Sequence, residues 1–367
     1  ETDTILTVEE LKEKLLPKYQ AAIDADVQTI MASYNSWNGV KCHGSKELLT
    51  DILKIEMGFD GFVISDWQGI DEIPGDYKSD IITSINAGID MVMVSGQGQP
   101  YKKFMRLLKE SAEEGLIPLA RIDDAVKRIL KVKIRNGLFD NPLVENDALK
   151  VIGSDAHRDI ARQAVRESVV VLKNDDIIPI SKDSKSIVVA GRGADNLGMQ
   201  CGGWTINWQG GQGDITIGTT ILDGIKKSVS AETNVIYSED GQDLNDVDGE
   251  LAVVVIGEDP YTEFFGDKDN LDLLNDDINT INNLKNKGYK VMVLLISGRP
   301  MNIAEHIDDW DGFAAIWLPG SEGDGVSDIL FGDFQSTGKL SYPWPIKAEH
   351  GANADDKDLL FNFGYGL

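Results

Sequence analysis

Short apolar runs alternate with amphipathic segments along the first 137 residues. The apolar runs predict three strands, at residues 27–34, 61–66 and 89–94. Between and around them, amphipathic segments predict helices at residues 8–26, 46–56, 80–86 and 100–137. Helices and apolar strands that alternate in this way are typical of parallel βα units.

Three such units are too few to close a barrel of eight strands, and alone they would expose the edges of their sheet. We therefore expect residues 1–138 to be the last units of a (β/α)8 barrel whose earlier strands lie outside the given sequence. The first residue is Glu1 rather than a methionine. This agrees with a chain that was processed or cut, or with the second part of a longer one.

The pattern after the first 138 residues predicts a second α/β domain. Residues 139–160 read as a linker, and a helix over residues 154–173 leads into a domain over residues 161–367. Strands are expected at residues 187–190, 234–237, 251–256, 290–296 and 312–318. Helical segments separate them, as in a doubly wound, flavodoxin-like sheet. The expected fold class is α/β, with the end of a barrel followed by an α/β sandwich whose sheet is mainly parallel.

Composition narrows the range of partners. The 42% of hydrophobic residues can fill two cores, and the longest apolar runs are too short to cross a bilayer. The formal charge of −26 argues against nucleic acids and anionic membranes as partners. It fits a neutral substrate and a secreted protein, extracellular or periplasmic. We favour a role of the acidity in solubility over one in attracting a substrate. Two cysteines and four scattered histidines show no metal-binding spacing, so we expect no metal site. We expect no cofactor either.

Two carboxylates follow apolar runs that we interpret as strands buried on both faces. Asp66 ends the run that begins at Gly61, and Glu263 follows the run that ends at Ile256. Ligands of α/β folds bind at the carboxyl ends of strands, and hydrolysis of a glycosidic bond requires two acids that flank the bond. Alternatively, Asp66 could cap the next helix or pair with a cation, and Glu263 could be an exposed loop residue.

Aromatic side chains accompany both acids. Trp67 and Trp204 could each offer a flat apolar face to a sugar ring, and the Tyr34 hydroxyl could hydrogen-bond the Asp66 carboxylate. Each has a plainer alternative: Trp67 could pack in the core, Trp204 could cover the core of the second domain, and Tyr34 could bond to backbone. For Trp208 we favour the role of a lid over that core.

Glu263 stands in a polar loop next to Phe264 and Phe265. We expect its aromatic neighbours to exclude water from the carboxyl group and to favour its protonated form, as a general acid requires. Glu258 and Asp259 are rival acids in the same loop, and local sequence does not separate the three.

A nucleotide site is another interpretation of the second domain. Gly191-Arg192-Gly193 begins like a dinucleotide-binding loop, but the third glycine, Gly198, comes too late. Residues 199–203 are also not expected to open a helix. This interpretation therefore rests on fold analogy alone.

Taken together, motifs along nearly the whole chain resemble glycoside hydrolase family 3, in particular its β-glucosidases and exo-β-glucanases. The motifs are Ser33-Tyr34-Asn35-Ser36-Trp37-Asn38-Gly39, Gly61-Phe62-Val63-Ile64-Ser65-Asp66-Trp67, Cys201-Gly202-Gly203-Trp204-Thr205, Pro260-Tyr261-Thr262-Glu263, Ser297-Gly298-Arg299-Pro300 and Trp317-Leu318-Pro319-Gly320-Ser321-Glu322-Gly323. The resemblance implies a barrel and a sandwich domain with the active site between them.

The resemblance also implies roles for single residues. Asp66 would be the nucleophile and Glu263 the acid/base of a retaining, exo-acting β-glucosidase or β-glucanase that acts on β-glucans or oligosaccharides. Trp67 and Trp204 would line the outer sugar subsite, and Tyr34 would lie beside the nucleophile. Two other functions stay open: a family 3 N-acetylglucosaminidase, whose acid is a His-Asp dyad of the barrel, and a non-catalytic sugar-binding module.

Part of the family pattern lies outside this chain. The first barrel strands of the family carry a Lys-His pair, an Asp and an Arg that hold the terminal glucose, and no matching stretch is present. We therefore expect the N-terminal part of the barrel, from the same or a second chain, to be a necessary partner. Glu72 stands where plant relatives usually have a basic residue, which leaves the linkage preference open.

Overall fold

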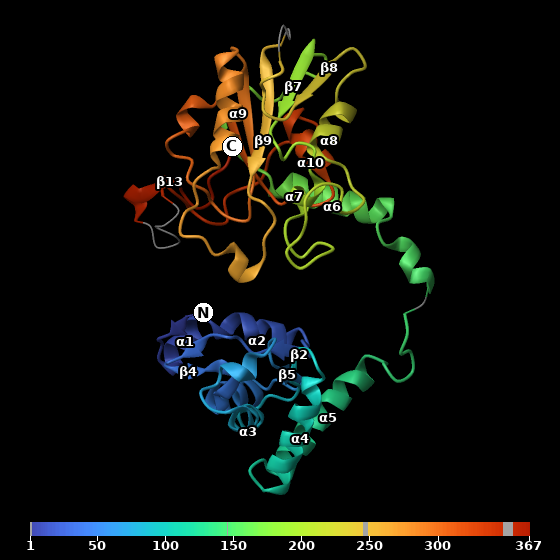
Figure 1. Ribbon diagram of the computed structural model, residues 1–367, viewed down its shortest axis with the longest axis vertical. Helices are drawn as coiled ribbons and strands as arrows, with labels where there is room; N and C mark the ends of the chain where they lie inside the picture. The colour runs from blue at the N-terminus through green and yellow to red at the C-terminus, as the bar shows by residue number, and fades with distance from the viewer. Residues whose placement is uncertain (1, 145, 245–248, 348–354) are drawn as a thin grey trace. The chain divides into compact units, whose positions relative to one another are not determined.

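The computed structural model describes residues 2–144, 146–244, 249–347 and 355–367. The chain forms two compact units (Figure 1), Glu1–Glu145 and Asn146–Leu367. They are called unit 1 and unit 2 below, and each is described by itself.

Unit 1 contains short strands and longer helices. The strands are β1 (Asp3–Thr4), β2 (Thr29–Met31), β3 (Ser36–Trp37), β4 (Val40–Lys41) and β5 (Phe62–Ile64). The helices are α1 (Val8–Lys14), α2 (Leu16–Asp24), η1 (Cys42–Gly44), the π-helix η2 (Glu47–Glu56), η3 (Gly69–Glu72), α3 (Tyr77–Ala87), α4 (Pro100–Glu113) and α5 (Leu119–Arg135).

The three apolar runs of unit 1 lie side by side and parallel. β2 pairs with β5, with Met31 opposite Ile64, and Ile64 also forms a parallel bridge to Met91. The strands are shorter than the sequence predicts. The first ends at Met31, and residues 89–94 contribute one isolated bridge instead of a strand.

Two segments that we predicted as continuous helices are each broken in two. The helix expected over residues 8–26 is interrupted at Leu15, because Pro17 in the first turn of α2 has no N–H to continue the hydrogen bonds of α1. The helix expected over residues 100–137 is interrupted between α4 and α5, where Gly115 has a φ of +73° and Pro118 precedes α5. Both breaks lie inside a helical pattern, so periodicity alone did not reveal them.

A buried ion cluster ties β5 to two helices. The Asp90 side chain is 0% exposed and accepts hydrogen bonds from Lys54 Nζ at 2.8 and 2.9 Å and from the Val63 N–H at 2.8 Å. Arg121 pairs with the same carboxylate. Burial lowers the pKa of Lys54 to about 8, although the charge of Asp90 opposes that shift. Because Val63 belongs to β5, the cluster fixes the strand that leads to Asp66.

We expect Asp90→Ala to lower the free energy of unfolding by about 3–5 kcal/mol, because it leaves the buried Lys54 ammonium without its anion and removes one of the two carboxylates that pair with Arg121. The control Asp51→Ala removes the exposed partner of Lys46 and should cost no more than about 1 kcal/mol. Urea unfolding of both variants of the whole protein measures the difference. Equal losses would show that the cluster does not hold unit 1 together.

Unit 2 is built around one six-stranded sheet. Its strands are β6 (Val170–Asn174), β7 (Ser186–Ala190), β8 (Asn234–Ser238), β9 (Leu251–Gly257), β10 (Lys290–Ile296) and β11 (Gly312–Trp317), with a small separate pair of β12 (Trp344–Pro345) and β13 (Leu359–Phe361). The helices are η4 (Asn146–Val151), α6 (Asp155–Ser168), α7 (Leu197–Cys201), α8 (Ile221–Ser228), η5 (Glu263–Gly266), α9 (Asn275–Asn286), η6 (Ile307–Asp309), α10 (Gly323–Leu330) and η8 (Asp356–Asp358).

The order of the strands confirms the predicted topology of the second domain. The sheet has the order β6-β11-β10-β9-β7-β8, with β6 antiparallel to β11 and the other pairs parallel. Counted along the chain from β7, the parallel strands follow the flavodoxin-like order 2-1-3-4-5. The prediction of an α/β chain with a mainly parallel second sheet is therefore confirmed.

Helices cover both faces of this sheet (Figure 1). Val253 and Val255 of β9 pack on one face with α8 and α10, while Val254 and Ile256 pack on the other face with α9. The helix expected over residues 154–173 is shorter in the structure: α6 ends at Ser168, and β6 follows. Consecutive β-branched residues, which favour strands, begin at the next position.

The order of the strands reverses between β7 and β9, and in open α/β sheets the crevice at such a point is where ligands bind. After β7 the chain forms α7, whose first turn is capped by the Asn196 side chain accepting the Met199 N–H at 3.0 Å. Our expectation that no helix opens in this segment is wrong, because Asn196 caps a helix that begins at Leu197. The loop after α7 carries Trp204, and the loop after β9 carries Glu263.

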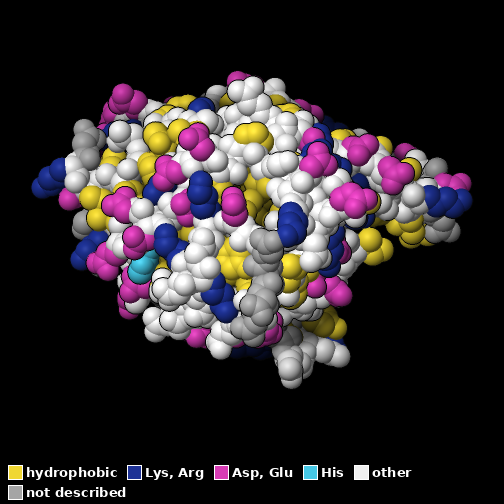
Figure 2. All heavy atoms as spheres, turned by 90° about the horizontal axis from the view of Figure 1, so that it is seen from above, with side chains coloured by type: hydrophobic (Ala, Val, Ile, Leu, Met, Phe, Trp, Pro, Cys, Tyr) yellow, Lys and Arg dark blue, Asp and Glu magenta, His cyan; other side chains and the backbone are white. Residues whose placement is uncertain are grey.

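Within the described residues, no helix is both long and apolar enough to cross a membrane. On the face shown in Figure 2, Asp and Glu side chains lie interspersed with Lys and Arg. The acidic excess of the chain therefore marks no single site on this face.

Candidate functional site

Asp66 lies just beyond the end of β5, in the turn that leads to η3. Its Oδ1 accepts the Trp67 N–H at 2.6 Å, and its carbonyl oxygen accepts the Gly69 N–H at 3.1 Å. The side chain is half-buried. Among the described residues it neither caps a helix nor pairs with a cation, so the two structural alternatives for Asp66 are wrong in unit 1.

Sequence reasoning missed His43, which lies directly against the Asp66 turn. The imidazole is 0% exposed, and its Nε2 accepts the backbone N–H of Asp66 at 3.0 Å. Burial lowers the pKa of His43, although the charge of Asp66 opposes this shift. The imidazole is therefore held neutral, and Nε2 keeps its lone pair as an acceptor. No local motif links positions 43 and 66, so only the fold reveals this contact.

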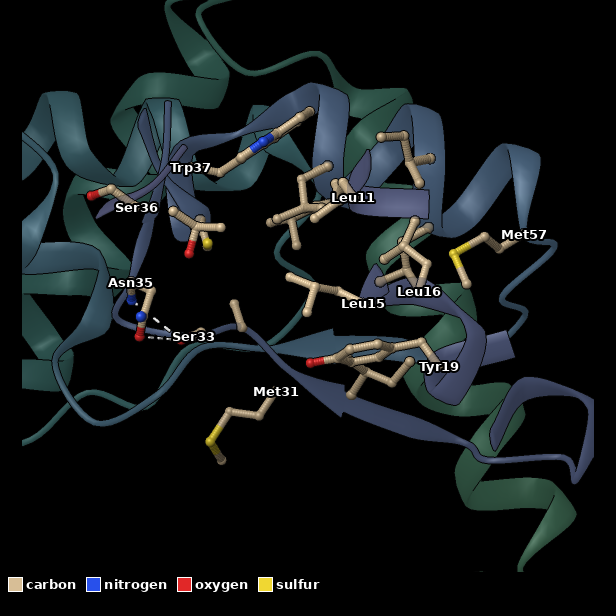
Figure 3. A pocket seen from close by; sticks show the side chains of 18 residues that line it. Leu11, Leu15, Leu16, Tyr19, Met31, Ser33, Asn35, Ser36, Trp37 and Met57 are labelled. Carbon is tan, nitrogen blue, oxygen red and sulfur yellow. Dashed lines mark hydrogen bonds between the residues drawn. The ribbon is translucent and has the colours of Figure 1, made fainter. Parts of the chain in front are cut away.

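Tyr34 packs against His43, the residue that bonds to the Asp66 turn. Its ring lies against His43, with centroids 6.0 Å apart and planes inclined by 59°. It does not end a strand as predicted, because Ser33 Oγ donates to Asn35 Oδ1 at 2.9 Å and accepts the Asn35 N–H at 3.2 Å (Figure 3). Side-chain bonds of this kind compete with strand pairing.

A cavity of about 280 Å³ lies in unit 1 next to β2 (Figure 3). Most of its lining is apolar, including Leu11 of α1, Leu16 of α2 and Leu15 between them. Asp66 and Trp67 are not among its lining residues. We therefore regard this cavity as part of the apolar interior of unit 1 and not as the candidate site.

Trp67 and Trp204 are both exposed, by 61% and 69%. Packing in the core is therefore wrong for Trp67 within unit 1, and a covering role over the core is wrong for Trp204 within unit 2. Trp208 is 42% exposed and contacts the rings of Phe264 and Phe265 with centroid distances of 5.8 and 5.7 Å. It thus packs on the Glu263 loop and does not act as the lid that we expected.

Glu263 opens η5 with a φ of +50°, a left-handed backbone conformation that is rare for residues other than glycine. Strained conformations of this kind concentrate at functional sites. The side chain is exposed in unit 2, because Phe264 and Phe265 turn toward Trp208. The expectation that these aromatic neighbours bury the carboxyl group is therefore wrong for unit 2 by itself.

The structure separates Glu263 from its two rivals. Glu258 is buried, pairs with Arg299 at 2.7 Å and accepts a hydrogen bond from the Tyr261 hydroxyl group at 3.1 Å. Burial alone would raise the pKa of Asp259, but the hydrogen bond and charge of Arg192 hold it below its usual value. In the described part of the chain, Glu263 has no hydrogen-bonded or ionic partner for its carboxylate. Glu258 and Asp259 instead fix the loop that presents it.

Direct hydrogen bonds join the Trp204 loop to the Glu263 loop. Gln209 Nε2 donates to Thr262 Oγ1 at 2.5 Å, and the Thr262 N–H donates to Gln209 Oε1 at 3.1 Å. A Cβ at Gly203 would collide with the backbone of Tyr261, so the loops approach this closely only because position 203 is glycine. Unit 2 therefore brings the loops that carry Trp204 and Glu263 together, beyond the carboxyl ends of β7 and β9.

The candidate residues thus fall into two groups. Unit 1 brings together Tyr34, Asp66 and Trp67 around the unpredicted His43, and unit 2 brings together Trp204 and Glu263. In the described residues, no three His, Cys, Asp or Glu side chains are arranged to hold a metal ion.

Comparison with known proteins identifies the family. Residues 2–132 match the model of the glycosyl hydrolase family 3 N-terminal domain, and residues 169–367 match the model of its C-terminal domain. The chain is 31% identical to a lysosomal β-glucosidase of Dictyostelium discoideum, over 97% of this chain and 48% of that protein. It is 30% identical to a β-xylosidase of Formosa agariphila, over 97% of this chain and 55% of that protein.

A solved structure agrees with these matches. The chain superposes on an exo-1,3/1,4-β-glucanase from a Pseudoalteromonas species with a TM-score of 0.90 and 38% identity, over 100% of this chain and 61% of that one. The chain spans about half the length of the curated relatives that it matches. The chain belongs to glycoside hydrolase family 3.

Proposed function

We propose that the protein is a retaining, exo-acting β-glucosidase or β-glucanase that releases glucose from the non-reducing ends of β-glucans or oligosaccharides. The observation that carries this proposal is an unpaired carboxylate beyond the end of a parallel strand in each unit, Asp66 after β5 and Glu263 after β9. Membership of the family supports a glycosidase, and its relatives include β-glucosidases and an exo-glucanase.

In the proposed mechanism Asp66 attacks the anomeric carbon while Glu263 gives its proton to the departing glycosidic oxygen. Water then attacks the glycosyl-enzyme, and Glu263 takes up the proton of that water. Retention requires the two carboxyl groups to come within about 5–5.5 Å of each other in the whole protein. Trp67 and Trp204 would contact the outer sugar, and Tyr34 would lie beside the nucleophile. No metal or cofactor takes part.

The wider organisation is also part of the proposal. The parallel run of β2, β5 and Met91 supports residues 1–138 as the last units of a (β/α)8 barrel, joined by residues 139–160 to the sandwich domain. The remaining strands of the barrel would supply the groups that hold the terminal sugar. The protein would act outside the cell or in the periplasm.

The stereochemistry of the first product tests the mechanism. We expect proton NMR of the whole protein acting on an aryl β-glucoside to show β-glucose first, followed by slow mutarotation to the α anomer. If α-glucose appears first, Asp66 is not a nucleophile and the proposal fails.

The choice of substrate tests the assignment of glucose. Aryl β-glucoside, β-xyloside and β-N-acetylglucosaminide should be turned over with the highest kcat/KM for the glucoside. Preference for the N-acetylglucosaminide or the xyloside would overturn the glucose assignment. Binding of a glucoside without release of any sugar would support a non-catalytic module instead.

A further inference from the structure

We infer that His43 is a positioning residue for Asp66. Its Nε2 accepts the backbone N–H of Asp66 and so fixes the turn that carries the carboxylate. This inference rests on the proposed function, because it concerns how the carboxylate of Asp66 is aimed. His43 lies in η1, far from β5 in sequence, yet its imidazole reaches the turn directly beyond that strand.

The turn is held by hydrogen bonds from several sides. The Asp66 N–H donates to His43 Nε2 at 3.0 Å, and the Trp67 N–H donates to Asp66 Oδ1 at 2.6 Å. Ser65 Oγ donates to the Asp66 carbonyl at 2.9 Å and accepts the Met93 N–H at 2.8 Å. The bond from His43 is the one among these that fixes the backbone of Asp66 to a side chain from a separate segment of the chain.

Packing leaves the imidazole little freedom. A Cβ on Gly69 would collide with the Nε2 and Cε1 atoms of His43, so the turn closes over the ring only because position 69 is glycine. The ring of Tyr34 lies against the imidazole as well. The side chain is fully buried, so water does not compete for the Asp66 N–H on this side.

The chemistry of the ring fits an acceptor. An imidazole whose Nε2 accepts a hydrogen bond carries its single proton on Nδ1. The charged groups that act on the ring are Asp66, which favours protonation, and Lys41, which opposes it together with burial. A protonated ring would have no acceptor for the Asp66 N–H, so the observed bond requires the neutral form.

Two substitutions of His43 test whether a hydrogen-bond acceptor is needed at the position of Nε2. Gln is close in size to His and carries an amide oxygen near the position of Nε2, whereas Met fills a similar space without an acceptor of comparable strength. We expect His43→Met to lower kcat for an aryl β-glucoside by about 10–100-fold with KM unchanged, because small displacements of a catalytic group are costly. His43→Gln should stay within about threefold of wild type, since it keeps the bond.

Two further readouts separate positioning from loss of fold. The rate of covalent labelling of Asp66 by a 2-deoxy-2-fluoroglucosyl fluoride should fall in parallel with kcat for the Met variant. Hydrogen exchange of the peptide that contains Asp66 should speed up for Met but not for Gln, whatever the activity. If His43→Met does not fold, Gly69→Ala crowds the same ring and should lower the labelling rate.

The outcomes distinguish the role of His43 from the proposed function. Wild-type labelling and exchange in His43→Met, equal losses in the Gln and Met variants, or normal labelling in Gly69→Ala would each overturn the role of His43 and leave the proposed function standing. A wild-type protein that is not labelled at Asp66 would overturn the proposed function, and the role of His43 with it.

Discussion

Asp66→Asn should lower kcat for an aryl β-glucoside by more than about 10⁴-fold, the scale on which enzymes lose activity when a nucleophile is removed. The neutral amide cannot form the glycosyl-enzyme, so the covalent route closes. Asparagine keeps an oxygen that can accept the Trp67 N–H, as Asp66 Oδ1 does at 2.6 Å. The turn and the midpoint of thermal unfolding should therefore stay unchanged.

A matched control guards this result against a general effect of lost charge. Asp51→Asn removes one negative charge from an exposed position of η2 and should leave kcat within about twofold, as for surface substitutions away from a site. Steady-state kinetics of both variants measures kcat, and thermal unfolding measures the midpoint of each. Asp66→Asn with wild-type turnover would exclude Asp66 as the nucleophile.

Glu263→Ala should lower kcat for substrates with poor leaving groups by about 10²–10⁴-fold, because the departing oxygen no longer receives a proton in the transition state. A substrate with a highly activated leaving group needs little protonation, so its glycosyl-enzyme should still form. Azide should then replace the water that Glu263 activates, restore turnover and yield β-glucosyl azide. Product analysis with and without azide measures this rescue.

Asp267→Ala provides the control, since Asp267 is an exposed acid that directly follows η5. It should retain kcat within a few-fold and show no response to azide. An unchanged rate in Glu263→Ala would favour the N-acetylglucosaminidase type of mechanism, in which a His-Asp dyad of the barrel supplies the proton. Equal losses in both variants would mean that the loop acts only as structure.

Much of unit 2 could be predicted from its sequence. The parallel strands β7, β9, β10 and β11 each carry a short apolar run buried on both faces, such as Ala252–Ile256, whereas the edge strand β8 is only partly buried. Helices separate these runs. That pattern is local, and it fixes the strands, their parallel pairing and the flavodoxin-like order. The missed strand β6 shows the limit, because its apolar residues directly follow those of α6 with no glycine or proline between them, and the run of valines is the one signal of the change.

Unit 1 was predicted less well, because local interactions there override the hydrophobic period. Pro17 breaks a helix that its apolar residues favour, and the bonds between Ser33 and Asn35 end β2 before Tyr34. Residues 89–94 are apolar enough for a strand but form a single bridge.

The sequence by itself determined that two carboxylates follow apolar strands and that tryptophans accompany them, because these features lie within single short segments. Only the structure shows that Trp67 and Trp204 are exposed. The tertiary structure decided which acid of the second loop is available, since Arg299 and Arg192 pair with Glu258 and Asp259 and leave Glu263 unpaired. It also brought His43 to the Asp66 turn. Both outcomes depend on contacts between distant segments, and such contacts form only when the strands and helices pack together.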